Sequence, residues 1–243
     1  MQEINNTKNF LILLIFTLIV LSTGLILKNT GYLTTSIFSA PIEVPVPDEI
    51  LDLTENNDFN NNGITNQQDI LEGAKNRIGI TTSYNGEYFS GGYPPDDTGV
   101  CTDVIWRSFE NAGYDLKNLL DTDIKNNIED YPRIEDEPDP NIDFRRVPNL
   151  ISFFEKFAQS LTITITPNDI ENLQQWQGGD IVTYARNPAT GLMHIGIVSD
   201  KRRRDGVPYL IHNYGHGTVE DNMLTLWPTE IIGHYRFPKT NNQ

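Results

Sequence analysis

The sequence predicts an α+β domain in which N-terminal helices pack on an antiparallel sheet. Two observations lead to this fold class. Helical periodicities dominate between residues 66 and 157, and short runs typical of strands follow between residues 180 and 237. Helices first and strands afterwards, with Gly-rich turns between the strands, is the order of an α+β domain rather than of a parallel sheet with crossover helices.

Four segments carry the helical pattern, with apolar residues three and four positions apart: Asn66–Arg77, Cys101–Ala112, Leu116–Ile128 and Asn149–Phe157. Gly113 follows the second segment, at the position where a glycine commonly ends a helix. Tyr84–Pro95 is rich in Gly, Tyr and Pro, and Glu129–Pro140 is acidic and rich in Pro. Both stretches are therefore predicted loops.

Four segments in the last third are predicted strands: Asp180–Ala185, Met193–Val198, Tyr209–His212 and Gly233–Phe237. Gly178-Gly179 and Asp205-Gly206 supply turns before and between them. The dense basic run Lys201–Arg204 directly precedes the second turn, so it decorates a hairpin.

Composition restricts the function class. The chain has 243 residues and a formal net charge of −15, which suits one medium domain with appendages. An acidic balance argues against a nucleic-acid partner, because phosphate binding requires patches of Lys and Arg. It suits cations, including Ca²⁺.

The N-terminus predicts a membrane anchor. Phe10–Leu27 is uncharged and rich in Leu and Ile, and a helix of this length crosses a hydrocarbon core of ~30 Å at ~1.5 Å per residue. We expect a transmembrane helix within residues 1–28, with the N-terminus inside and the remaining chain extracytoplasmic. The Pro-rich residues 29–50 then form an extended linker. A cleaved signal peptide and a secreted form are the alternative, although no small-residue cleavage site follows Leu27.

Residues 51–73 contain the spacing of an EF-hand calcium loop. Its predicted ligands stand at loop positions 1, 3, 5, 7, 9 and 12: Asp58, Asn60, Asn62, Ile64, Asn66 and Asp69. Ile64 contributes its carbonyl, and Gly63 stands where the loop turns sharply. Only the two end residues are charged, so we expect weak binding of a structural Ca²⁺. The alternative is an Asn-rich linker without metal. No catalytic cofactor is expected.

Cys101 is the single cysteine of the chain and opens a predicted helix. A helix N-terminus lowers the pKa of a thiol, and a thiol nucleophile needs a base and a group that orients the base. His194 and His212 lie on successive predicted strands, which can place both on one face of the sheet. We expect the Cys101 helix to pack against that face. Asn213 is the reserve orienting residue.

The motifs Gly-Val-Cys-Thr-Asp-Val, Gly-Asp-Ile-Val, His-Ile-Gly-Ile-Val-Ser-Asp, Ile-His-Asn and Gly-His-Tyr-Arg occur in this order. Together they resemble an uncharacterised family within the NlpC-type, papain-like cell-wall cysteine peptidases. The resemblance covers residues 67–238. It implies a papain-like fold with Cys101 as nucleophile, His194 as general base and acid, and His212 as orienting residue. It also implies a cell-wall peptide as substrate.

Other polar and aromatic residues near the motifs have two interpretations each. Tyr88 and Tyr93 precede the nucleophile in the Gly/Pro loop and are the predicted substrate-binding residues. Asp103 either caps the Cys101 helix or pairs with Arg107 at i+4. The pair Arg145-Arg146 either binds a substrate carboxylate or forms a solvated surface.

The remaining histidines are predicted to be structural. His234 is expected to be a hydrogen-bonded sheet residue, and His216 lies in a Gly-rich loop.

The sequence thus predicts an extracytoplasmic thiol hydrolase that cleaves an amide bond. Two alternatives stay open. The same fold and thiol suit an acyltransferase or a hydrolase of other amides or esters. A cell-surface binding module with a structural cysteine is the non-enzymatic alternative, because free cysteines are commonly inert core residues.

Overall fold

A computed structural model describes residues 57–134 and 137–239. The predicted anchor at residues 1–28, the linker at residues 29–50 and the first part of the predicted calcium segment lie outside the described residues. In these two ranges, no helix combines the length and the apolar character needed to cross a membrane.

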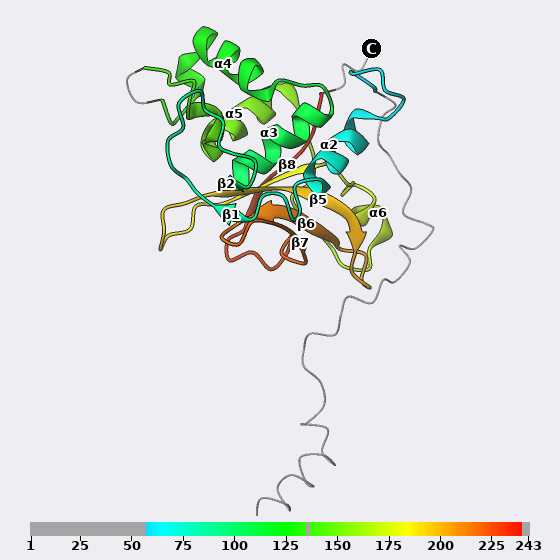
Figure 1. Cartoon of the computed structure of the whole chain (residues 1–243). Coiled ribbons are helices and arrows are strands. Elements are labelled where there is room, and N and C mark those ends of the chain that lie inside the picture. Colours follow the sequence, from blue (N-terminus) through cyan, green and yellow to red (C-terminus); the bar gives the residue numbers. More distant parts are fainter. Residues whose placement is uncertain (1–56, 135–136, 240–243) are drawn as a thin grey trace, which may run out of the picture. The chain divides into compact units, whose positions relative to one another are not determined.

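The mixed helix-and-sheet class and the antiparallel sheet are confirmed (Figure 1). The helices are α2 (Asn66–Lys75), α3 (Cys101–Asn111), α4 (Leu116–Asn126), α5 (Val147–Phe157) and the short α6 (Ile170–Leu173), with 3₁₀ turns η1 (Ile128–Asp130) and η2 (Asp143–Arg145). The strands are β1 (Ser83–Tyr84), β2 (Thr98–Gly99), β3 (Gln159–Ser160), β4 (Ile181–Tyr184), β5 (His194–Arg202), β6 (Pro208–Asn213), β7 (Thr218–Asp221) and β8 (Ile231–Arg236).

The main sheet has six strands in the order β3-β8-β4-β5-β6-β7, and all neighbours are antiparallel. Strands β1 and β2 form a separate parallel pair. Figure 1 shows α2, α3, α4 and α5 together on one side of the sheet. The sequence did not predict β3, β7 or α6, because each has at most four residues and, unlike β4, contains no run of apolar residues.

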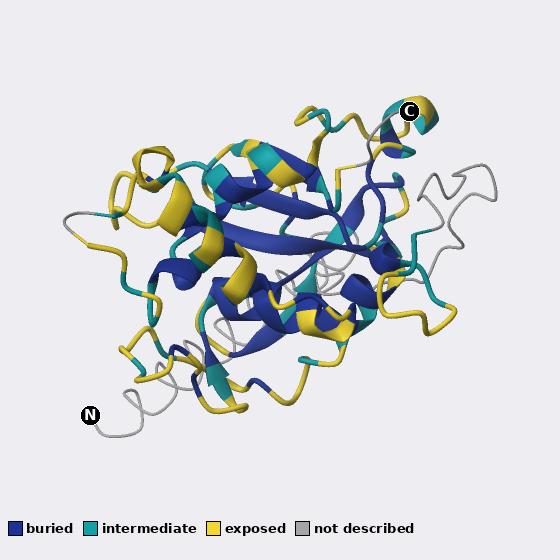
Figure 2. Ribbon diagram, turned by 90° about the horizontal axis from the view of Figure 1, so that it is seen from above, coloured by how far each residue is buried: buried dark blue, intermediate teal, exposed yellow. Residues whose placement is uncertain are grey.

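The sheet separates two apolar clusters. On the helix side, Ile195, Ile197 and Ile211 pack with α3. On the opposite side, which we call the far face, Val198 and Leu210 lie in a second cluster. The two sets alternate along β5 and β6, as side chains of a strand must. Burial on both faces explains why β5 is almost wholly buried (Figure 2).

Helix α3 is central to the helix layer. It packs against α2, where a Cβ on Gly73 would lie 2.8 Å from Ser108 Cα. Only glycine permits this close approach of the two helices. Asp103 accepts a hydrogen bond from the backbone N–H of Val100 at 2.7 Å, which satisfies a polar group at the start of the helix. The first residue of α3 is therefore held firmly against the sheet.

Candidate active site

Cys101 is the first residue of α3 and is buried. Its sulfur accepts hydrogen bonds from backbone N–H groups, including those of Ile195 on β5 and Thr102. The thiol therefore connects the start of α3 with the beginning of β5. It also borders a cavity that opens on the other side of the residue.

The sulfur occupies a gap between β5 and β6. Val198 exchanges backbone hydrogen bonds with the chain before β4, so by alternation the N–H of Ile195 points the other way, toward β6. The β5–β6 ladder, however, has its first pair at Ile197 and Ile211. The Cys101 sulfur thus accepts the hydrogen bond from the Ile195 N–H that β6 would accept if the ladder continued.

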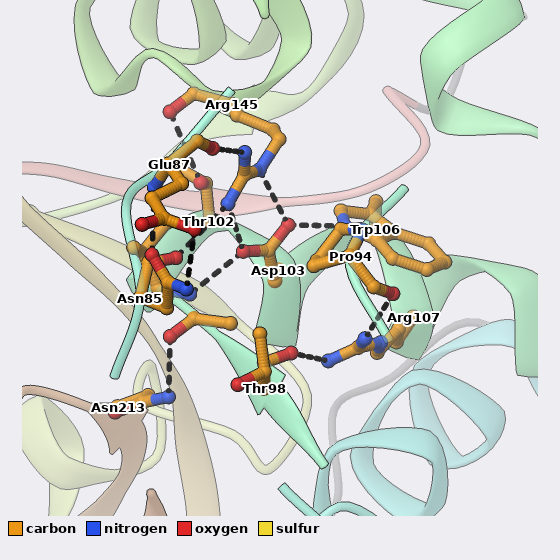
Figure 3. A network of polar contacts seen from close by, with 12 residues as sticks. Asn85, Glu87, Pro94, Thr98, Thr102, Asp103, Trp106, Arg107, Arg145 and Asn213 are labelled. Atoms are coloured by element: carbon orange, nitrogen blue, oxygen red, sulfur yellow. Dashed lines mark hydrogen bonds and ion pairs between the residues drawn. The ribbon is translucent and has the colours of Figure 1, made fainter. Parts of the chain in front are cut away.

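Asn213 fastens the end of β6 beside this gap. Its side-chain amide donates to the carbonyl of Gly99 at 3.0 Å and to that of Ser83 at 3.3 Å. Figure 3 shows this bond reaching the segment just before α3. Asn213 therefore positions the segment before α3 and does not contact an imidazole, contrary to its reserve role as orienting residue.

His194 and His212 come together, as predicted. His194 Nε2 lies 2.7 Å from His212 Nδ1, and His212 Nε2 lies 3.2 Å from Asp221 Oδ1. We call these three residues the imidazole network. The His194 ring stacks on Trp227 with centroids 3.8 Å apart. Asp221 comes from β7, a strand that carried no sequence signal.

The packing of α3 corrects one expectation. The helix does not pack against the face that carries the histidines, because His194 pairs with Tyr184 on the far face while α3 contacts Ile195. Side-chain alternation places neighbours on opposite faces. Within the described residues, no hydrogen bond joins the thiol to an imidazole. Met193 and Ile195, on either side of His194, nevertheless both border Cys101 or its cavity.

The imidazole network fixes the tautomers of both rings. A carboxylate only accepts hydrogen bonds, so His212 donates from Nε2 to Asp221 and accepts at Nδ1. His194 must then donate from Nε2, and its Nδ1 carries a lone pair. Among the described residues, this Nδ1 has no hydrogen-bond partner. The network therefore leaves one free proton acceptor at the first residue of β5.

Burial favours the neutral forms of the Cys101 thiol and the His194 imidazole. It raises the pKa of the Cys101 thiol to about 12, in spite of the N–H groups around the sulfur. Burial, and secondarily the neighbouring His212, holds the pKa of His194 well below its usual 6.5. The expectation that the helix start ionises the thiol is therefore wrong for the free protein, because desolvation outweighs the helix dipole.

Asp103 forms a buried network at the start of α3 (Figure 3). Its carboxylate receives two hydrogen bonds of 2.9 Å from Arg145 and one of 2.8 Å from Trp106 Nε1. We call these three residues the arginine network. The capping role of Asp103 is confirmed, whereas its pairing with Arg107 is wrong: Arg107 donates instead to neighbouring carbonyls and to a threonine. Arg145 is buried, so it is no solvated surface residue.

The cavity beside Cys101 has a volume of about 240 Å³. Its lining includes Tyr84, the first turn of α5, and four arginines: Arg133, Arg145, Arg146 and Arg186. The sequence did not indicate Tyr84, Arg133 or Arg186, because they come from a short strand and two loops without motifs. Their common location depends on how those loops meet in space.

The two predicted substrate-binding tyrosines lie outside this lining. Tyr88 is exposed and hydrogen-bonds Asp139 at 3.2 Å and Asn141 at 2.7 Å. Tyr93 packs edge-on against Trp106, with centroids 4.9 Å apart. Tyr84 borders the cavity in their place.

The predicted calcium loop closes on itself. The Asp69 carboxylate accepts hydrogen bonds from the side-chain amides of Asn60 and Asn62 at 2.9 to 3.1 Å. Asp58 accepts from the backbone N–H groups of Asn62 and Gly63 at 3.1 and 2.8 Å. The side chains of Asn60, Asn62 and Asp69 therefore meet, and Asp58 binds the backbone of the same loop.

The other two predicted ligands shape the loop. The N–H of Ile64 donates to Asn62 Oδ1 at 2.7 Å, and Asn66 Oδ1 accepts from the N–H of Phe59 at 2.8 Å. No group of three or more His, Cys, Asp or Glu residues suited to a metal occurs in the described ranges. The loop offers two carboxylates with amide oxygens, a donor set that Ca²⁺ accepts. The amides must first turn their oxygens inward.

His234 is a hydrogen-bonded residue of β8, as predicted. Its ring stacks on Trp176 at 3.8 Å and bonds Asp180 at 3.0 Å. His216 takes no part in the two networks near Cys101.

Two comparisons with known proteins find a match for this chain. A family model described as "Domain of unknown function (DUF1287)" matches residues 71–237. The chain is also 38% identical over 174 residues to the uncharacterized protein YijF of Escherichia coli strain K12, an alignment that covers 69% of this chain and 80% of the relative. No solved structure matches significantly.

Proposed function

This chain belongs to the DUF1287 family, a domain of unknown function, and from its geometry we propose that it is a thiol hydrolase that cleaves an amide bond. One observation carries the proposal. His194 Nδ1 has no hydrogen-bond partner among the described residues, and the next residue, Ile195, donates its backbone N–H to the Cys101 sulfur. A thiol nucleophile and a base near it are the minimum set for acyl transfer; Cys101 and Met193, the residue before His194, both line the cavity.

In the proposed reaction, the Cys101 sulfur attacks the amide carbonyl while His194 Nδ1 takes the thiol proton. The backbone N–H groups of Cys101 and Thr102 stabilise the oxyanion. His194 then returns the proton to the leaving amine, and water hydrolyses the thioester to release the acid and restore the thiol. His212 and Asp221 hold the His194 tautomer throughout.

A neutral thiol and a neutral imidazole fit this sequence of steps. Proton transfer then accompanies attack, instead of preceding it as in a resident thiolate–imidazolium pair. The missing thiol–imidazole hydrogen bond is no obstacle, because catalytic hydrogen bonds are often long in free enzymes and shorten when substrate binds.

The finer assignments are part of the proposal. They are a papain-like, NlpC-type fold, a cell-wall peptide as substrate, and an extracytoplasmic location with an N-terminal membrane anchor. The support for them is the order of Cys101, His194 and His212 on a helix start followed by two antiparallel strands, together with the apolar run before the domain.

Mass spectrometry of purified wall fragments tests the activity. We expect the wild-type protein to release peptides with new amine and carboxyl ends, and the Cys101→Ser variant to release none. Adding an amine acceptor separates the alternatives: a hydrolase gives free acid, whereas an acyltransferase gives the amide of the added amine. Identical fragment patterns for wild type and variant would remove the proposal.

A non-catalytic binding module is the second candidate, because the thiol is buried and its pKa is raised. Iodoacetamide labelling of Cys101 across pH 6 to 10 distinguishes the two. For the hydrolase, we expect labelling to slow in the His194→Gln variant, since the base assists proton loss. Labelling that does not depend on His194 would favour the module.

We also propose that the Asp58–Asp69 loop binds a structural Ca²⁺. With a Kd of ~1 mM, typical of weak extracellular sites, 10 mM Ca²⁺ stabilises the fold by about 1.4 kcal/mol. Thermal unfolding should shift upward with Ca²⁺ and not with Mg²⁺, and Asp69→Asn should remove the shift. Asp115→Asn, which alters a carboxylate at the start of α4 outside the loop, is the matched control. No shift in the wild type would make the segment a linker.

A further inference from the structure

The cavity beside Cys101 carries a positive charge that the proposed chemistry does not explain. Four arginines line it: Arg133, Arg145, Arg146 and Arg186. Of the described residues in the lining, none is Asp or Glu. This is the reverse of the whole chain, which has 33 acidic and 18 basic residues. A local excess of arginine in an acidic protein calls for a ligand of opposite charge.

The four arginines are not equivalent. Arg145 is neutralised by Asp103, with both side chains buried and two hydrogen bonds of 2.9 Å. It also donates to the carbonyl of Glu87 at 2.9 Å. Its donors are thus largely used within the fold, and it forms part of the cavity wall rather than an anion-binding group.

The other three guanidinium groups retain free donors. Arg146 is half-buried, lies 3.4 Å from Asp143 and donates to the carbonyl of Arg133. Arg186 is exposed and donates to the carbonyl of Gly191. Arg133 is exposed, and in the described part of the chain its guanidinium has no ion-pair partner. Each of the three has more N–H donors than these bonds consume.

These arginines come from two sides of the fold, the helix layer and the sheet. Arg133 follows η1 and Arg146 directly precedes α5, whereas Arg186 belongs to the loop between β4 and β5. Val147 and Pro148 of the first turn of α5 also line the cavity. They form the N-terminus of this helix, and a helix N-terminus carries a partial positive charge. A group bound between the two sides would meet cationic donors on both.

From this arrangement we propose that Arg133, Arg146 and Arg186 bind a free carboxylate of the substrate, close to the scissile amide. The inference rests on the proposed function and names its substrate class: an anionic peptide rather than a neutral or amidated one. The cavity volume of about 240 Å³ lies below the ~300–1,000 Å³ of sites for whole small molecules. It therefore accommodates one end of a longer substrate.

The test compares one set of soluble wall peptides in two forms. One form is untreated, and in the other the carboxylates are converted to carboxamides with carbodiimide and ammonia. We expect the full-length wild-type protein to cleave the untreated form with a kcat/KM at least tenfold higher. Arg133→Gln and Arg186→Gln should each lower that value about tenfold, as loss of a charged hydrogen bond does, and should lower cleavage of the amidated form several-fold less.

Arg204→Gln is the matched control. Arg204 is exposed in the turn between β5 and β6, away from the cavity lining, and its substitution makes the same change in net charge. It should leave both rates unchanged. A loss equal to that of Arg186→Gln would mean that only overall charge matters, and would overturn the inference.

Binding to the Cys101→Ala variant, measured by calorimetry with both peptide forms, separates this inference from the proposed function. Equal cleavage of the two forms would overturn the inference and leave the hydrolase standing. No cleavage, with tight binding of the untreated form alone that Arg186→Gln weakens, would support the inference and remove the hydrolase. Equal binding of the two forms, or binding of neither, would overturn the inference.

Discussion

Two polar networks lie on either side of Cys101, and they differ in almost every physical respect. The arginine network (Asp103, Arg145 and Trp106) contains a permanently charged guanidinium and a carboxylate, with both charged side chains 1% exposed or less. The imidazole network (His194, His212 and Asp221) joins two imidazole rings to a carboxylate that is 29% exposed.

This difference suggests separate roles for the two networks. A charged pair that is fully hydrogen-bonded in a dry interior has one stable arrangement, so the arginine network holds the start of α3 in place. The imidazole network keeps one nitrogen free and reaches partial solvent at Asp221, so it can pass a proton. We therefore expect damage to the first network to appear in stability and damage to the second to appear in rate.

The largest expected effect is that of His194→Gln. Removing the base should lower kcat/KM by up to about 10⁴-fold, or ~5.5 kcal/mol of transition-state stabilisation. The midpoint of urea unfolding should change little, because glutamine can still donate to His212. Parallel activity and unfolding measurements check both parts. Unfolding at a much lower urea concentration would show that this network also supports the fold.

The second effect is that of Asp103→Asn. The substitution conserves shape but leaves Arg145 buried without a counter-ion, which should lower the free energy of unfolding by about 3–5 kcal/mol. Urea denaturation measures it.

Asp121→Asn is the matched control, since its partly exposed pair with Lys117 at i,i+4 should contribute only ~0.3–0.5 kcal/mol. Equal losses in the two variants would mean that the arginine network is no more structural than a surface pair.

The third effect is that of Asp221→Asn. An asparagine can donate to His212 as well as accept from it, so the His194 tautomer is no longer fixed. We expect kcat to fall roughly 10–100-fold, less than the ~10⁴-fold observed when an orienting aspartate bonded directly to a catalytic histidine is replaced. Steady-state kinetics check this, with KM expected to stay constant. A rise in KM at constant kcat would assign Asp221 to substrate binding.

The smallest effect is a dependence of stability on pH. The pKa of His194 is depressed in the fold, so the unfolded state binds more protons below pH ~6.5, and stability should fall as the pH drops through that range. The Cys101 pKa is raised from 9.0 to about 12, so the unfolded chain loses this proton first and stability should fall above pH 9. One pH unit into either range costs at most ~1.4 kcal/mol per group.

Variants assign the two limbs of this profile. His194→Gln should flatten the acid limb, and Cys101→Ser should flatten part of the alkaline limb, to which buried tyrosines such as Tyr184 and Tyr235 also contribute. Unfolding free energies at pH 5, 7.5 and 10 provide the comparison. An acid limb that His194→Gln leaves intact would place the responsible group elsewhere.

The sequence alone determined the fold class, four of the helices and the strands β4, β5, β6 and β8, because these elements depend on apolar patterns that local residues carry themselves. It also determined the proximity of His194 and His212, since strands that follow each other through a tight turn pair directly. The cap formed by Asp103 was also predictable, because its partner, the backbone N–H of Val100, is only three residues away.

Tertiary structure decided the remainder. The partner of Asp103 is Arg145, 42 residues away, and not Arg107 on the same helix. Asp221 joins the histidines from β7, a strand that has no run of apolar residues. The ionisation of Cys101 depends on its burial against β5, which no local signal contains. The burial of a side chain and its long-range partners depend on segments that are distant in the sequence. For that reason the ionisation and contacts of this site follow from the fold and not from the motif.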